Sequence, residues 1–113
     1  MSLNNYLIGI AATTGKVQGR VTVISPNNLE YLLADPSRID ILVSKNPFPS
    51  LILVLKYARG LITESGGITS HAAIIAREVG IPCVVGVTTG IIKLLDGMPV
   101  LLDAEQGKVW YEA

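Results

Sequence analysis

Residues 60–87, GLITESGGITSHAAIIAREVGIPCVVGV, combine a strand, a glycine pair, a helix and a second strand in that order. The short apolar run LIT predicts the first strand, and CVVGV predicts a buried second strand. Between them, a helix is expected to start near Thr69 and to end at Gly80, with Pro82 just beyond as a stop signal. A strand, a helix and a strand in succession indicate an α/β fold.

The remaining strands are predicted from apolar or alternating segments bounded by turn residues. They cover residues 6–24, 39–44, 98–103 and 108–112. The first of these segments is expected to be broken by Gly15 and Gly19, because glycine weakens a strand interior. With the strands of the opening segment, this pattern predicts layered sheets with helices on one face.

Two more helices are predicted between the early strands. The first is expected to be capped by Asn27 or Asn28, and its apolar face is formed by Leu29, Leu32 and Leu33. The second is expected to begin at Pro49, run to about Ala58 and end at Gly60, since proline suits a first helical position and glycine a helix end.

Composition places the chain among small single-domain proteins, with one domain expected over residues 1–113. Nine basic and nine acidic residues cancel to a net charge of zero and form no cluster, so nucleic acid or an anionic membrane is not an expected partner. No apolar run approaches the roughly 20 residues of a membrane span. With no signal peptide at the start, a cytoplasmic protein is expected.

The single cysteine, Cys83, excludes an internal disulfide, and its apolar surroundings predict an inert core residue. With one histidine in the chain as well, no Cys/His metal site is expected. Apolar residues around Phe48 and Trp110 could form a surface for a partner, so an oligomer is an open alternative.

The glycine pair, Gly66 and Gly67, leads directly into a helix whose first turn contains His71. The first turn of a helix carries backbone N–H groups without partners and a partial positive charge, which together stabilise an anion such as phosphate. The glycines leave room for a bulky group, and Ser70 can donate a hydrogen bond to phosphate. An imidazole at this position could attack a phosphoryl group, and the helix end would hold the resulting phosphohistidine.

Each of these residues also has a purely structural interpretation. A lone histidine near a helix start is often structural or solvated, and Thr69 and Ser70 are first of all candidate helix caps. Glu64 could either orient His71 or pair with an arginine. Arg77 lies roughly 100° or more around the helix from His71, which favours a surface or ion-pairing role.

The opening segment also resembles the signature of the phosphohistidine swivelling domain, the mobile domain of phosphoenolpyruvate-utilising enzymes. That family includes phosphoenolpyruvate synthase, pyruvate phosphate dikinase, the first enzyme of the sugar phosphotransferase system and the rifampicin phosphotransferases. The resemblance extends to GKVQGRVTVI (residues 15–24), IDILVS (39–44) and LLDGMPVLLDAEQGKVWYE (94–112), so it covers nearly the whole chain.

The resemblance implies a three-layer β/β/α domain in which His71 is phosphorylated, through Nε2, and Thr69 holds the ring in place. Such a domain swings between a nucleotide-binding domain and a domain that binds phosphoenolpyruvate or pyruvate. It binds no cofactor or metal itself, and ATP and Mg²⁺ are expected on a partner domain or subunit. The expected role is a phosphoryl carrier, incomplete as an enzyme on its own, with the final acceptor open.

Two alternatives belong to other functional classes. A non-catalytic regulatory or assembly module could share the fold, although the retained His71 argues against it. A free-standing small enzyme is disfavoured, because one histidine at a helix end provides a nucleophile but no substrate pocket.

Overall fold

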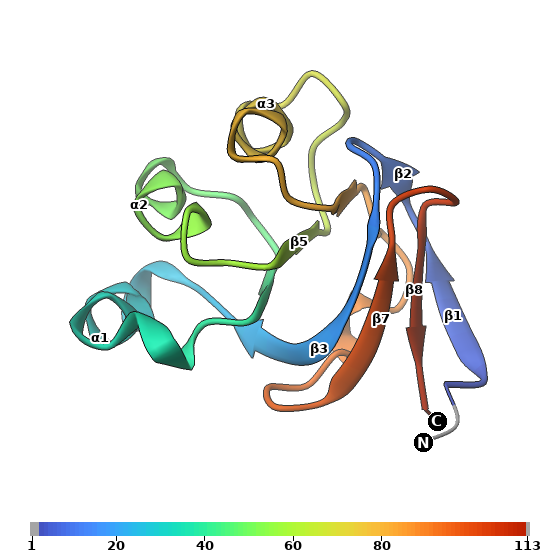
Figure 1. Cartoon of the computed structure of the whole chain (residues 1–113), viewed down its shortest axis with the longest axis horizontal. Coiled ribbons are helices and arrows are strands. Elements are labelled where there is room, and N and C mark those ends of the chain that lie inside the picture. The colour runs from blue at the N-terminus through green and yellow to red at the C-terminus, as the bar shows by residue number, and fades with distance from the viewer. Residues whose placement is uncertain (1–2, 113) are drawn as a thin grey trace.

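Strand β3 (Lys16–Val23) joins the two sheets of the domain, as the computed structural model of residues 3–112 shows. Its first part, residues 16–20, pairs antiparallel with β7 (Pro99–Asp103). Its last part, residues 21–23, pairs in parallel with β4 (Ile41–Ser44). One long strand therefore belongs to both sheets, which stack on each other as two layers (Figure 1).

The predicted break at Gly19 is wrong, because this glycine lies inside β3 and pairs with Val100. A Cβ atom there would collide with the carboxylate of Asp40 and the guanidinium of Arg59. The glycine therefore permits a close approach of side chains to the strand rather than ending it. Gly15, with φ of +99°, lies just before β3 and does interrupt the segment as predicted.

The central sheet continues from β4 through β5 (Gly60–Thr63) and β6 (Cys83–Val85), all parallel, to a short antiparallel edge strand, β2 (Ile10–Ala11). Every residue of β4, β5 and β6 is buried. Because layers cover both faces of this sheet, its strands are almost continuously apolar instead of alternating.

The second sheet is antiparallel and has the order β1, β8, β7, β3, with β1 at Asn5–Ile8 and β8 at Lys108–Tyr111. The strand predicted over residues 6–24 is thus three strands, β1, β2 and β3. The first two are separated at Gly9, whose N–H donates to a carbonyl of the β7–β8 turn.

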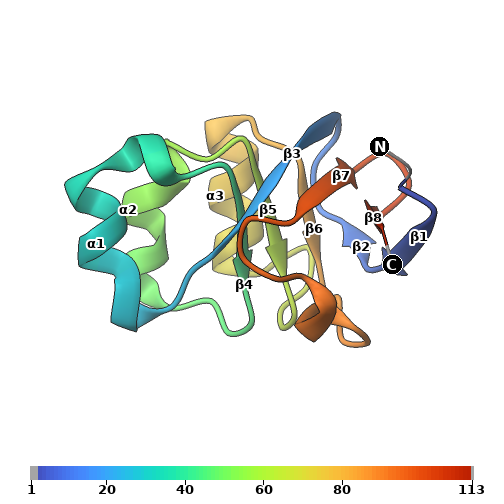
Figure 2. The ribbon, with the colours of Figure 1, turned by 90° about the horizontal axis from the view of Figure 1, so that it is seen from below.

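Three helices form the remaining layer: α1 (Leu29–Ala34), α2 (Ile52–Leu55) and α3 (His71–Val79). Figure 2 shows them together on one side of the central sheet, with β1, β7 and β8 on the other side. Short 3₁₀ turns accompany them: η1 at Pro26–Asn28, η2 at Pro36–Arg38, η3 at Pro49–Leu51 and η4 at Ile91–Lys93.

The cap of the first helical segment differs in part from the prediction. Asn28 occupies the N-cap position of α1, as predicted, but its side chain makes no capping bond to that helix. The capping bond lies one turn earlier, where the hydroxyl of Ser25 accepts the N–H of Asn27 at 3.3 Å. The Asn28 side chain returns a hydrogen bond by accepting the Ser25 N–H at 3.0 Å. This reciprocal capping box sets the 3₁₀ turn that precedes α1.

The second predicted helix is shorter than expected. Pro49 opens the 3₁₀ turn as predicted, but α2 ends at Leu55, and Gly60 is the first residue of β5 instead of a helix terminator. A Cβ on Gly60 would lie 2.6 Å from the Leu102 side chain of the facing sheet. Gly60 is therefore a packing requirement between the two sheets.

Two hydrophobic cores separate the three layers. Leu42 and Leu61 face the helices, whereas Val43 and Ile62 face the antiparallel sheet, so successive residues of β4 and β5 serve opposite cores. The predicted α/β class and the three-layer β/β/α arrangement are confirmed. Within residues 3–112, no helix is long and apolar enough to cross a membrane.

Candidate functional site

His71 is the first residue of α3, and its side chain is exposed. Ser70 caps the helix, since its hydroxyl accepts the N–H of Ala73 at 3.3 Å. The N–H groups of His71 and Ala72 have no acceptor among residues 3–112. Gly80 ends the helix in the left-handed conformation, as predicted. The imidazole therefore stands beside two backbone donors at the positive end of a nine-residue helix.

The glycine pair has two distinct structural roles. Gly66 has a φ of +100°, and a Cβ there would also come within 3.2 Å of the Ser70 side chain. Gly67 has no positive φ, and a Cβ on it would meet no heavy atom within 4 Å. Gly66 therefore shapes the loop, while the space beside Gly67 is open.

The loop leaves β5 along a path set by the neighbouring strand. Glu64 donates its backbone N–H to the Ser44 carbonyl, and Ser65 donates to the Lys45 carbonyl, both at 3.2 Å. The buried Thr63 hydroxyl donates to the Ser65 carbonyl at 2.9 Å. The Glu64 carboxylate makes no ion pair or hydrogen bond within the described residues, so neither role suggested for it gains support.

Arg77 takes a role that the sequence interpretation missed. Its Nε donates to the Ala12 carbonyl at 2.8 Å, and its Nη2 donates to the carbonyl of Ile68 in the glycine loop. It is therefore neither ion-paired nor a simple surface residue, because its guanidinium connects α3 to two loops. Ala12 lies 65 residues away in the chain, so no local sequence signal could have revealed this contact.

Thr69 is exposed, and its side chain makes no hydrogen bond in the part of the chain that the structure describes. Ser70, not Thr69, is the helix cap. The proposed part of Thr69 in orienting the His71 ring stays a prediction, as does phosphate binding by the glycines and Ser70.

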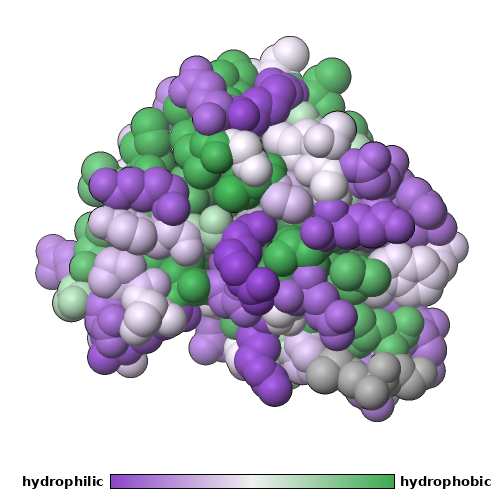
Figure 3. Space-filling view, in the orientation of Figure 1, coloured by the Kyte–Doolittle hydropathy of each residue, from purple (hydrophilic) through white to green (hydrophobic). Residues whose placement is uncertain are grey.

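A groove of about 360 Å³ adjoins His71 on the helix layer. Its walls come from the loop after β4, from η3 and α2, and from the first turn of α3, and they include Phe48, Ile52, Ala72 and Ile75. Among residues 3–112, no lysine, arginine, aspartate or glutamate side chain lines it. On the face shown in Figure 3, apolar residues around α2 and α3 are interspersed with hydrophilic ones. This region thus offers contact area for an apolar partner but no cation for a phosphoryl group.

The other residues singled out from the sequence lie elsewhere. Phe48 is half-buried against the helix-side core, and Trp110 is half-buried on β8, where its ring packs on Tyr6 with the centroids 4.8 Å apart. Cys83 is fully buried, and burial raises the pKa of its thiol to about 12 although the charge of Arg77 acts in the opposite direction. The prediction of an inert core cysteine agrees with this position.

Comparison with known families matches residues 37–107 to the mobile domain of PEP-utilising enzymes. The matched region covers more than half of the chain and contains the glycine loop, His71 and α3. The chain belongs to this family. The resemblance seen in the sequence is therefore confirmed across β4, β5, β6 and β7.

Mobile-domain relatives at about 40% identity occur within much larger enzymes. The chain is 42% identical to an uncharacterized phosphotransferase of Bacillus subtilis and 40% identical to a phosphoenolpyruvate synthase of Aeropyrum pernix. These matches cover 93% and 90% of this chain but only 12% of each relative. Proteins that contain a mobile domain of this kind thus include phosphotransferases in which other domains make up most of the length.

The fold itself extends beyond phosphotransferases. The crystal structure of aconitase X from Thermococcus kodakaraensis superposes with a TM-score of 0.69 at 25% identity, covering 97% of this chain and 100% of that one. The same layers therefore occur in a protein that is not named as a phosphotransferase, so function has to be argued from the residues of the site.

Proposed function

We propose that this domain is a phosphoryl carrier and that His71 is the residue that carries the phosphoryl group. One observation supports this most directly: an exposed imidazole lies at the start of a capped helix, beside two backbone N–H groups without acceptors. A phosphoryl group on the ring would place its anionic oxygens near those donors. Membership of the mobile-domain family supports the same role.

In the proposed transfer, an imidazole nitrogen, Nε2, attacks the phosphorus of a donor. The new N–P bond forms as the donor's bridging P–O bond breaks, and the leaving oxygen keeps the electron pair. The acceptor reverses this step by attacking phosphohistidine and releasing the neutral ring. Gly66, whose positive φ shapes the loop, and Gly67, beside which space is open, would let the phosphoryl oxygens approach the backbone. Ser70 accepts from Ala73 but retains its O–H to donate, and Thr69 would orient the ring.

The groove beside His71 supports a mechanism in which partner domains supply the positive charge needed for phosphoryl transfer. Its walls provide no lysine or arginine, and the guanidinium of Arg77 is already bound to two carbonyl groups. Charge neutralisation during transfer would then come from partners, one binding ATP with Mg²⁺ and one binding phosphoenolpyruvate, pyruvate or another acceptor. The carrier domain would contribute the nucleophile and an apolar docking surface.

Chemical phosphorylation with labelled phosphoramidate tests the site directly, because the chain contains a single histidine. Attack by the ring on phosphorus would form the N–P bond and release ammonia. We expect one acid-labile, alkali-stable label per chain on the folded wild-type protein. His71→Ala should carry no such label. No label on folded wild-type protein would refute the assignment.

Enzymatic phosphorylation tests the carrier role itself. The domain is incubated with its cognate nucleotide-binding partner and labelled ATP, and the label is then followed to the acceptor. We expect transfer through wild-type protein and none through His71→Ala. If His71→Ala left the activity of the complete enzyme unchanged, the domain would be a regulatory or assembly module instead.

A further inference from the structure

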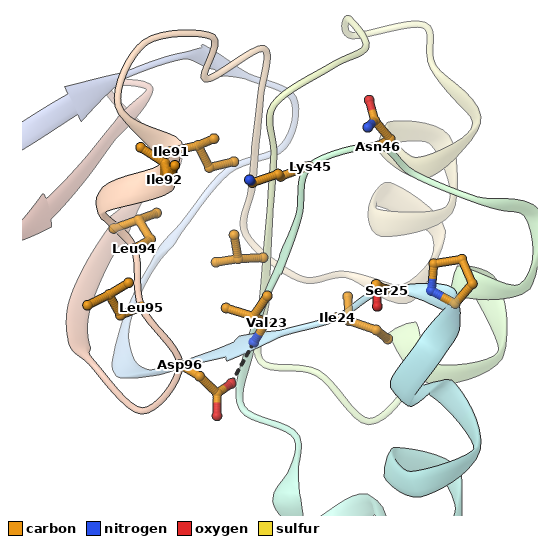
Figure 4. A pocket seen from close by; sticks show the side chains of 12 residues that line it. Val23, Ile24, Ser25, Lys45, Asn46, Ile91, Ile92, Leu94, Leu95 and Asp96 are labelled. Carbon is orange, nitrogen blue, oxygen red and sulfur yellow. Dashed lines mark hydrogen bonds between the residues drawn. The ribbon is translucent and has the colours of Figure 1, made fainter.

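A second cavity, of about 550 Å³, opens at the carboxyl ends of β3 and β4, between these strands and η4 (Figure 4). His71 is not among the residues that line it. In parallel α/β sheets, ligands bind characteristically beyond the carboxyl ends of the strands. The position and the volume of this cavity both suit a small ligand.

The floor of the cavity is a part of the core between the two sheets. Val43, Ile91 and Leu94 line it, and each is at most 3% exposed. Its rim includes Ile92 and Leu95, which are 70% and 65% exposed. Large apolar side chains that border an apolar hollow are costly to leave in water, so this arrangement favours an occupant with an apolar body.

The polar groups of the cavity are separated by sign. Lys45 extends from the end of β4 toward Ile91 and Ile92, while Asp96 lies at the opposite end (Figure 4). The Asp96 carboxylate already accepts the N–H of Val23 at 2.8 Å. Within residues 3–112, Lys45 forms no ion pair. One end of the cavity therefore presents an uncompensated cation.

Asn46 adds hydrogen-bonding capacity at the same end. Its side chain also lines the cavity and makes no hydrogen bond among the described residues. The main chain beside it is held in place, because the Lys45 carbonyl accepts hydrogen bonds from the N–H and the hydroxyl of Ser65. An ammonium and an amide on a fixed backbone are suited to a carboxylate.

We propose that this cavity binds a small amphipathic carboxylate. The apolar body would lie over Val43, Ile91 and Leu94, and the carboxylate would meet Lys45 and Asn46. A neutral apolar molecule would leave Lys45 without a counter-ion, and an organic cation at that end of the cavity would be repelled by it, so the carboxylate is placed at the Lys45 end and away from Asp96. The site is separate from His71 and does not depend on phosphoryl transfer.

Octanoate is a suitable probe, with 1-octanol as a neutral molecule of the same chain length. Titrations are followed by the methyl NMR signals of Ile91, Ile92, Leu94 and Leu95. We expect octanoate to shift these signals in wild-type protein and in His71→Ala alike, and to bind more tightly than octanol. Signals that shift around the His71 groove instead, or not at all, would overturn the proposal.

Two lysine variants separate a specific contact from general charge attraction. Lys45→Met keeps an apolar stem but removes the charge in the cavity, whereas Lys93→Met makes the same change on an exposed lysine of η4 that does not line it. We expect Lys45→Met to weaken octanoate binding about three- to tenfold and to leave octanol binding unchanged. Lys93→Met should bind both as wild type does. Equal losses in the two variants would contradict the assigned head-group position.

Discussion

Replacing Arg77 with methionine should loosen the loop that leads to His71. The side chain of Arg77 reaches from α3 to the Ile68 carbonyl in that loop and to the Ala12 carbonyl, 2.8 Å from its Nε. Methionine preserves an unbranched apolar stem and helix propensity but can donate to neither carbonyl. The loop would then be held mainly by its backbone contacts with the end of β4.

The size of the effect follows from the two lost hydrogen bonds. A bond from a charged donor contributes more than a neutral one, but Arg77 is exposed and water can replace part of what is lost. We therefore expect the free energy of unfolding to fall by about 1–2 kcal/mol and Tm by about 5–10 °C. Arg77→Lys can hold only one of the two carbonyls, so it should lie between methionine and wild type.

Urea unfolding and amide hydrogen exchange measure this effect separately. In Arg77→Met, exchange of the hydrogen-bonded loop amides of Glu64, Ser65 and Ser70 should accelerate about 5- to 30-fold, the factor equivalent to 1–2 kcal/mol. Arg20→Met is a matched control, because Arg20 is an exposed arginine that donates from Nη1 to the Gly97 carbonyl, at 2.9 Å, away from the loop. Equal exchange of the Glu64, Ser65 and Ser70 amides in the two variants would refute the assigned role of Arg77.

Three further predictions follow from side chains outside the reacting atoms. Ser70→Ala should lower the free energy of unfolding by about 1 kcal/mol, because the N–H of Ala73 loses its acceptor. Ser70→Asp should recover most of this loss, since aspartate is also a good N-cap residue. Equal urea midpoints for Ser70→Ala and wild type would contradict the capping role. In the folded protein, Cys83 should resist a thiol reagent at mildly alkaline pH, because burial raises the pKa of its thiol to about 12. It should react in concentrated urea, where the thiol is exposed. Rapid labelling of the folded protein would disprove this prediction. Burial of Asp40 raises its pKa, but the hydrogen bond from Arg59 and other favourable contacts lower it further, below the ordinary 3.8. The stabilisation by this carboxylate is thus present above pH 3.8 and lost as the pH falls through the lower folded value, so Asp40→Asn should make unfolding free energy decline less steeply on acidification than in wild type.

The central part of the site could be predicted from sequence because its signals are local. A cap at Ser70, a glycine in the left-handed conformation at Gly80 and a proline at position 82 act within a few residues of the helix that they bound. The glycine pair before His71 is equally local. The resemblance to the mobile domain covers nearly the whole chain and therefore implies the rest of the fold.

The errors in the sequence interpretation share one cause. Gly19 and Gly60 were expected to interrupt or end an element, yet both lie within strands. Each accommodates a group that comes from elsewhere in the chain: Asp40 and Arg59 against Gly19, and Leu102 against Gly60. A local propensity for breaking structure cannot distinguish these positions, because their requirement for glycine arises from packing between elements.

By itself, the sequence determined the order of strands and helices, the helix ends around His71 and membership of the mobile-domain family. Only the tertiary structure decided that Arg77 binds Ala12 and Ile68, that an apolar groove adjoins His71, and that a separate cavity with Lys45 at one end opens beyond β3 and β4. The reason is physical: capping and turn formation act over a few neighbouring residues, whereas these contacts exist only after the layers have packed and brought distant segments together.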